Sequence, residues 1–91
     1  MINYYAIFDR SLNLSNAPFV APDDKSAIRL VRNMLLASDD GVVSRVAKDC
    51  DIRFVGFYNE ETCSFVPREK DHIVIDLSAI PLPDKEVDNE L

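Results

Sequence analysis

Residues 51–66 read DIRFVGFYNEETCSFV, and this stretch decides the fold. Runs rich in β-branched and aromatic side chains flank a polar centre at 59–62, which is typical of two antiparallel strands joined by a turn. We expect a hairpin of strands 51–58 and 63–66, in which Tyr58 pairs with Cys63. In this register Phe65 lies opposite Gly56 and covers the gap that the missing side chain leaves.

The expected hairpin has two unlike faces, because successive side chains of a strand point to opposite sides. We expect the more apolar face to line the core; it carries Ile52, Phe54, Tyr58, Cys63 and Phe65. The second face carries Arg53, Val55, Phe57, Ser64 and Val66. That second face therefore combines a guanidinium group with an aromatic ring.

Two more strands and a turn flank this hairpin. Residues 2–9 and 72–77 are rich in β-branched and aromatic side chains, which favours strands. Residues 10–22 hold Ser, Asn and Pro around a short apolar piece at 19–20, which predicts a turn with room for a short edge strand.

One main helix is expected after Asp23 and Asp24, whose carboxylates can accept hydrogen bonds from the free N–H groups of a helix start. Apolar residues follow at helical spacing and form one stripe, made of Ala27, Ile28, Val31, Met34 and Leu35. Gly41 can take the left-handed conformation that ends a helix. Residues 42–49 fit either a second short helix or an irregular connection.

Together these elements predict an α+β fold, with a three- to four-stranded, mostly antiparallel sheet and one main helix packed on one face. A chain of 91 residues allows a single domain, which we place at 1–79. From Ile80 the sequence turns to prolines and acidic residues, so we expect an acidic, disordered tail at 80–91. Small domains bury little surface, and we therefore expect a homodimer.

Charge and composition exclude several classes of protein. The chain has 10 Lys and Arg against 16 Asp and Glu, a net charge of −6, which argues against a polybasic nucleic-acid binder. No apolar run approaches the ~20 residues of a membrane helix. The N-terminus lacks the basic region of a signal peptide. We therefore expect neither a membrane helix nor a signal peptide.

The chain offers little material for a metal centre or a catalytic site. Cys50 and Cys63 fall roughly 26 Å apart along the expected strand, too far for a disulfide, so we expect free thiols. With His72 they are too few for a metal site, and we expect no metal and no cofactor. Asp49 and Asp51 lie at a strand entry that is usually wet, whereas catalytic carboxylates need a partly dry site. We expect no enzyme.

Several segments resemble one viral family. NYYAIFDR at 3–10, APDD at 21–24, and SRVAKDCD at 44–51 followed by GFYNEET at 56–62 resemble the small nonstructural protein of gokushovirus-type microviruses, which are phages with circular single-stranded DNA genomes. Cys63 departs from the family pattern, which has Gly there for a left-handed turn position. The resemblance implies a protein of the bacterial host cytoplasm that acts in single-stranded DNA synthesis or its hand-over to packaging.

A basic stripe on the helix is the first candidate binding surface. Lys25, Arg29 and Arg32 share one helix face at i, i+4 and i+7. Three cations along ~10 Å of helix can follow a phosphate backbone. A solvated helix face with ordinary charges is the competing interpretation.

The second face of the hairpin is the other candidate. Arg53 and Arg68 lie opposite each other if strand pairing continues past Pro67, and a bound anion would relieve their repulsion. Phe57 shares the face with Arg53, and aromatic rings beside Arg suit the stacking of single-stranded bases. Three alternatives remain open: the face is a dimer interface, residues 10–20 cover it, or Pro67 ends the pairing early.

Two functional hypotheses follow. The first is a non-enzymatic phage accessory protein that acts in single-stranded DNA synthesis, by weak contact with the DNA. The alternative is a protein-interaction module that engages a viral or host replication or assembly protein through the same sheet face or the acidic tail.

Overall fold

A computed structural model describes residues 1–82 and shows an antiparallel sheet with two helices. The two long strands β1 and β4 pair along their whole length, from Ile2 with Tyr58 to Asp9 with Cys50. Short strands line both outer edges: β2 and β3 pair with β1, and β5 and β6 pair with β4. The strands are β1 (Ile2–Asp9), β2 (Leu14–Ser15), β3 (Phe19–Val20), β4 (Cys50–Asn59), β5 (Ser64–Pro67) and β6 (Ile73–Asp76).

The α+β class is confirmed, but the sheet has six strands rather than three or four. The additional strands are short pieces that share an edge of a long strand, two on each side. Local patterning finds the long strands, whereas two-residue strands such as β2 and β3 exist only through their pairing with β1.

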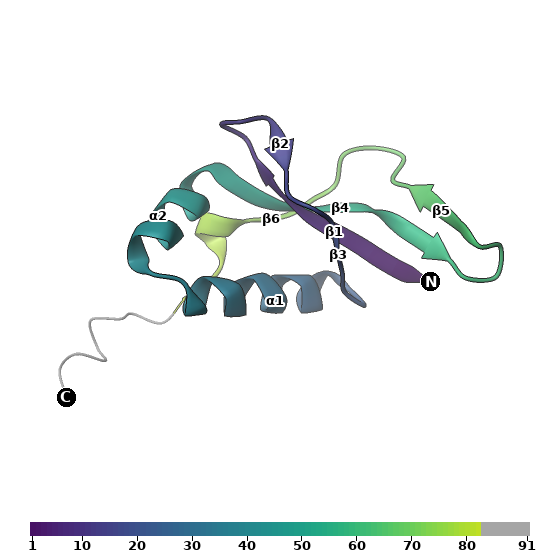
Figure 1. The fold of residues 1–91 in the computed structure, drawn as a ribbon, viewed down its shortest axis with the longest axis horizontal. Helices are drawn as coiled ribbons and strands as arrows, with labels where there is room; N and C mark the ends of the chain where they lie inside the picture. The colour runs from purple at the N-terminus through teal and green to yellow at the C-terminus, as the bar shows by residue number, and fades with distance from the viewer. Residues whose placement is uncertain (83–91) are drawn as a thin grey trace.

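Helix α1 (Asp24–Ala37) lies across one face of the sheet (Figure 1). Its start is fixed by the Asp23 side chain, which accepts a 2.8 Å hydrogen bond from the Ser26 N–H. Its buried stripe consists of Ala27, Val31 and Leu35. The helix stops short of the β4–β5 hairpin, so that end of the sheet extends beyond the helix (Figure 1).

A second helix, α2 (Asp40–Asp49), follows at once and settles the assignment left open for 42–49. The Asp39 side chain accepts a 2.8 Å hydrogen bond from the Val42 N–H and so caps this helix. The expected left-handed cap at Gly41 is therefore wrong. Gly41 lies in the first turn of α2, and only Gly56 of the two glycines has positive φ.

The core lies between the helices and the sheet and is closed by the end of the described chain. Tyr5 and Ile52 from the central strands are 1% and 0% exposed. After β6, the short 3₁₀ helix η1 (Leu77–Ala79) buries Leu77, and Ile80 is also buried. Since Leu82 packs against the same cluster, the packed domain runs past the boundary expected at 79. Most of the expected tail, 83–91, lies outside the described residues.

The hairpin exists, but its register differs from the expected one. Tyr58 pairs with Phe65, not with Cys63, and Asn59 pairs with Ser64. The Asn59 side chain accepts a hydrogen bond from the Glu61 N–H at 3.0 Å and helps to close a four-residue turn. Cys63 itself takes the left-handed conformation, with φ of 57°, that the family pattern assigns to Gly.

A β-bulge in β4 exchanges the two faces of the hairpin. Tyr4 pairs with Gly56 and Tyr5 with Phe54, so Val55 is an extra residue in the ladder. Beyond the bulge, Phe57 lies on the helix side of the sheet, opposite Asn3. The expected core face is therefore wrong for Tyr58, Cys63 and Phe65, and Cys63 and Phe65 are exposed.

Gly56 is required at the bulge. Its φ is +153°, and a Cβ atom there would collide with the Val66 carbonyl oxygen and lie 2.8 Å from the Phe65 ring. Phe65 does cover Gly56, as expected, although the cross-strand partner of Gly56 is Pro67. No helix within residues 1–82 is long and apolar enough to cross a membrane.

Substituting Gly56 tests the bulge. Gly56→Ala should lower the free energy of unfolding by at least about 2 kcal/mol, because the added methyl group meets backbone and the φ is unfavourable. Urea denaturation followed by circular dichroism measures this change. Gly41→Ala is the matched control and should be neutral or slightly stabilising, since its added Cβ meets only the Asp39 carboxylate at 3.4 Å. Equal effects of the two variants would contradict the bulge.

Candidate functional site

Arg53 lies on the face of the sheet that α1 does not cover. Its Nε donates a 2.7 Å hydrogen bond to Asp51, and its guanidinium lies 3.9 Å from the centre of the Phe8 ring. The side chain is 16% exposed. Arg53 is therefore held by its own neighbours rather than presented to an external anion.

Asp51 is the centre of a charged cluster, whose other members are Arg53, Arg10 and Asp76. It is buried, whereas the sequence predicted a solvent-exposed position. Arg10 donates a second hydrogen bond to it at 2.8 Å and also contacts Asp76 at 3.1 Å. Burial alone would raise the pKa of Asp51, but the hydrogen bonds and charges of Arg53 and Arg10 outweigh it and hold that pKa below its usual value. Two cations and two carboxylates balance, so the cluster offers no net charge to a ligand.

Arg68 does not lie opposite Arg53. The β4 partner of Arg68 is Val55, whose carbonyl accepts its backbone N–H at 3.0 Å, whereas Arg53 pairs with Ile73 on β6. The Arg68 guanidinium donates to the Phe54 carbonyl at 2.9 Å and pairs with Asp71 at 3.1 Å. The expected repulsion between the two arginines, and the anion needed to relieve it, are wrong.

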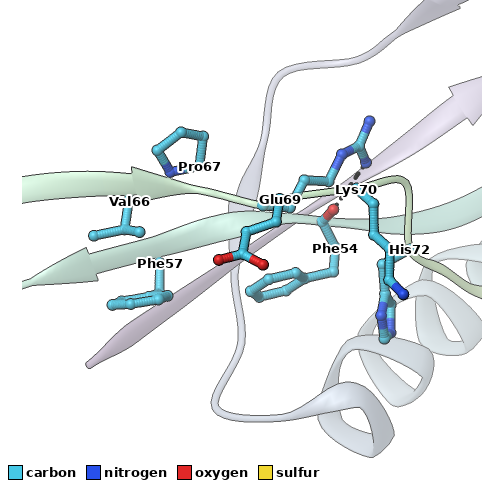
Figure 2. Close-up of a pocket in the computed structure, with 8 residues that line it drawn as sticks. Phe54, Phe57, Val66, Pro67, Glu69, Lys70 and His72 are labelled. Atoms are coloured by element: carbon cyan, nitrogen blue, oxygen red, sulfur yellow. Dashed lines mark hydrogen bonds between the residues drawn. The ribbon is translucent and has the colours of Figure 1, made fainter.

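Phe57 lies on the opposite face from Arg53, because the extra residue Val55 stands between them. It lines a cavity of about 330 Å³ on the helix side of the sheet, at the end that α1 leaves uncovered (Figure 2). The lining residues are Phe54, Phe57, Val66, Pro67, Arg68, Glu69, Lys70 and His72. We call this cavity the Phe57 pocket. Of the binding residues expected on the second face of the hairpin, Phe57 and Arg68 line this pocket and Arg53 does not.

The rim of the Phe57 pocket reaches the first turn of α1. The His72 ring packs against Phe54, with ring centres 5.8 Å apart, and its Nε2 lies 3.6 Å from the Asp24 carboxylate. The Tyr5 hydroxyl donates a 2.7 Å hydrogen bond to the same carboxylate. Burial, with Asp24 beside it, raises the pKa of Tyr5. This chain of contacts holds the start of α1 beside the pocket.

The basic stripe of α1 is only partly available. Lys25 and Arg29 are exposed, but Arg32 donates a 2.9 Å hydrogen bond to the Pro81 carbonyl. The contact of Arg32 shows that this helix flank faces the C-terminal segment. The sequence pattern identified the stripe, but it did not identify Lys70 and His72, whose loop has no periodic signal.

The two cysteines are the remaining candidate groups. Cys50 is buried and Cys63 exposed, both as free thiols, and the Tyr58 hydroxyl donates to the Cys63 sulfur at 3.0 Å. Within residues 1–82, no three side chains of the metal-binding types gather closely enough to hold an ion.

Residues 2–80 match the model of the family described as Phage ORF5 protein. The chain belongs to this family. The match covers every helix and strand of the domain, from β1 to η1, together with the buried Ile80. No curated protein and no solved structure matches. The description names a phage but no group of phages, so the microvirus origin stays a prediction.

Asp51→Asn tests the charged cluster of this phage ORF5 protein. The variant should lose roughly 2 to 3 kcal/mol of unfolding free energy at pH 7, because two partly buried arginines lose their shared carboxylate. Urea denaturation measures the loss. Asp49→Asn, an adjacent change outside the cluster, is the control and should cost less than about 0.5 kcal/mol.

The pH dependence of the same variants gives an independent check. The pKa of Asp51 is lower in the folded protein than in the unfolded chain, so its contribution is complete above about pH 5. The contribution disappears as pH falls through the folded pKa. The difference in stability between wild type and Asp51→Asn should therefore shrink between pH 5 and about pH 2. A constant difference would show that the carboxylate is not ionised within the cluster.

Proposed function

We propose that this phage ORF5 protein is a non-enzymatic accessory protein of a microvirus-type phage, and that it acts in single-stranded DNA synthesis in the cytoplasm of the bacterial host. The sequence resemblance at 3–10, 44–51 and 56–62 supports the type of phage and the stage of the viral cycle. The proposed means of action is weak, direct contact with single-stranded DNA at the Phe57 pocket.

The pocket supplies both kinds of contact that single strands use. Phe57 and Phe54 offer apolar ring surface for a base, and base–aromatic stacking is sequence-tolerant because every base has a π-face. Lys70 lines the pocket and supplies positive charge for an adjacent phosphate, and Lys25 and Arg29 are exposed on α1, outside the pocket lining. This meeting of aromatic rings and lysine at an uncovered end of the sheet is the observation that carries the proposal.

The charges around the pocket predict low affinity. Glu69 lines the pocket, Asp71 neutralises Arg68, and Asp24 lies beside His72. Two or three cations therefore remain to meet phosphates. Weak binding suits a protein that touches many positions of a growing strand.

The charged cluster supports a non-enzymatic role. A carboxylate that acts as a base, nucleophile or metal ligand must reach the substrate or the metal with one of its oxygens. Asp51 is the buried carboxylate within residues 1–82, and Arg10 and Arg53 occupy its oxygens.

Fluorescence anisotropy with a labelled thymidine oligonucleotide tests the proposal. Wild type should bind with a dissociation constant of tens of micromolar at about 50 mM salt. With two or three phosphate contacts, affinity should fall roughly seven- to eighteenfold by about 200 mM salt. Phe57→Leu, which keeps apolar bulk but removes stacking, and Lys70→Glu should each weaken binding at least about fivefold.

A matched control separates the pocket from general charge. Arg45→Glu makes the same change of charge as Lys70→Glu on an exposed position of α2. It should reduce affinity less than twofold. If wild type shows no binding at about 100 µM protein, or if Arg45→Glu weakens binding as much as Lys70→Glu, direct contact at the pocket is refuted. The protein-interaction hypothesis then takes its place.

A further inference from the structure

A second groove lies beside α1, apart from the Phe57 pocket. It has a volume of about 320 Å³ and runs between the helix and the edge of the sheet at the β2–β3 connection. Its lining residues are Ile7, Asn16, Ala17, Phe19, Leu30, Val31 and Met34. This groove shares no residue with the Phe57 pocket, and none of its lining residues is charged. We call it the α1 groove.

Leu30 and Met34 form an exposed apolar wall of the α1 groove. They lie one helical turn apart and are 50% and 44% exposed. The next positions around the helix on this flank are Ser26, Asn33 and Ala37, all uncharged. A neutral strip therefore follows the length of α1.

We propose that a second copy of this chain occupies the α1 groove, with α1 packed antiparallel against α1 of the partner. A two-fold axis between Leu30 and Met34 sets Leu30 of each copy beside Met34 of the other. In this arrangement Leu30 and Met34 of each copy line their own groove and also insert into the groove of the partner. The surface is complementary to itself, which is what a symmetric dimer requires.

Charge favours a second copy over other occupants. Residues 1–82 hold 12 acidic and 9 basic side chains, so two copies carry the same net charge of −3 and repel each other at long range. They can approach closely where charge is missing from both, and the α1 groove provides such a strip. A basic or acidic partner protein would gain nothing from a neutral groove.

The size of the contact sets its strength. Helix α1 is ~21 Å long, and a contact limited to one pair of such helices is smaller than the ~800 Å² per partner of a standard interface. The dimer should therefore dissociate in the micromolar range. It leaves both Phe57 pockets open on the outer flanks, but the proposal does not depend on what those pockets bind.

Multi-angle light scattering across a dilution series tests this inference. The mass of wild type should approach two chains at about 200 µM and fall toward the single-chain 10.3 kDa at about 5 µM. Leu30→Glu and Met34→Glu should each remain at 10.3 kDa throughout, because each new carboxylate would be buried against an apolar side chain of the partner with no cation to pair with it. Circular dichroism confirms that each variant is folded.

Leu12→Glu is the matched control. Leu12 is 66% exposed in the turn after β1 and takes no part in the groove, so this variant should dimerise like wild type. Three results would overturn the inference: a monomer at about 200 µM wild type, a dimer that survives both groove variants, or a mass that grows beyond two chains. Since at least one folded groove variant is needed, Met34→Glu serves if Leu30→Glu unfolds.

Discussion

The ladder between β1 and β4 contains one residue more on β4 than on β1, and that residue, Val55, determines what each face of the sheet presents. Before it, Arg53 points to the uncovered face and joins Asp51. After it, Phe57 points to the helix side and lines a pocket. Gly56 makes this shift sterically feasible, because the backbone of β5 and the Phe65 ring lie where a side chain would be. The separation of the charged cluster from the aromatic pocket follows from this bulge.

Sequence patterns predicted the elements whose signals are local. The strand at 2–9, the Asp23 cap and the existence of the hairpin all follow from periodicity and capping chemistry within a few residues. The register of the hairpin does not, because the turn closes between Asn59 and Ser64 with Cys63 in the left-handed conformation, and the bulge in β4 is defined by pairing with β1 some fifty residues away. The exchange of faces at Val55 then moved Phe57 away from Arg53 and brought it to Lys70 and His72.

Only some of the contacts made by the arginines could be predicted from the sequence. Asp51 and Arg53 stand two residues apart on one strand, so they share a face, and their pairing could have been expected. The contact of Arg10 with Asp51 follows once β1 and β4 are paired antiparallel, since Arg10 comes directly after Asp9 and its partner Cys50. The bonds from Arg32 to Pro81 and from Arg68 to Phe54 depend on loop paths, for which the sequence carries no comparable signal.

The position of Pro67 at the end of β5 has a consequence for the outer edge of the hairpin. Arg68 directs its N–H inward to Val55, and because N–H groups alternate along an antiparallel strand, Pro67 occupies an outward position. Proline has no N–H to offer there, so the exposed edge lacks one of the donors that an incoming strand would need. The missing donor makes it harder for strands of other molecules to add to the projecting hairpin, which is the step that leads to aggregation.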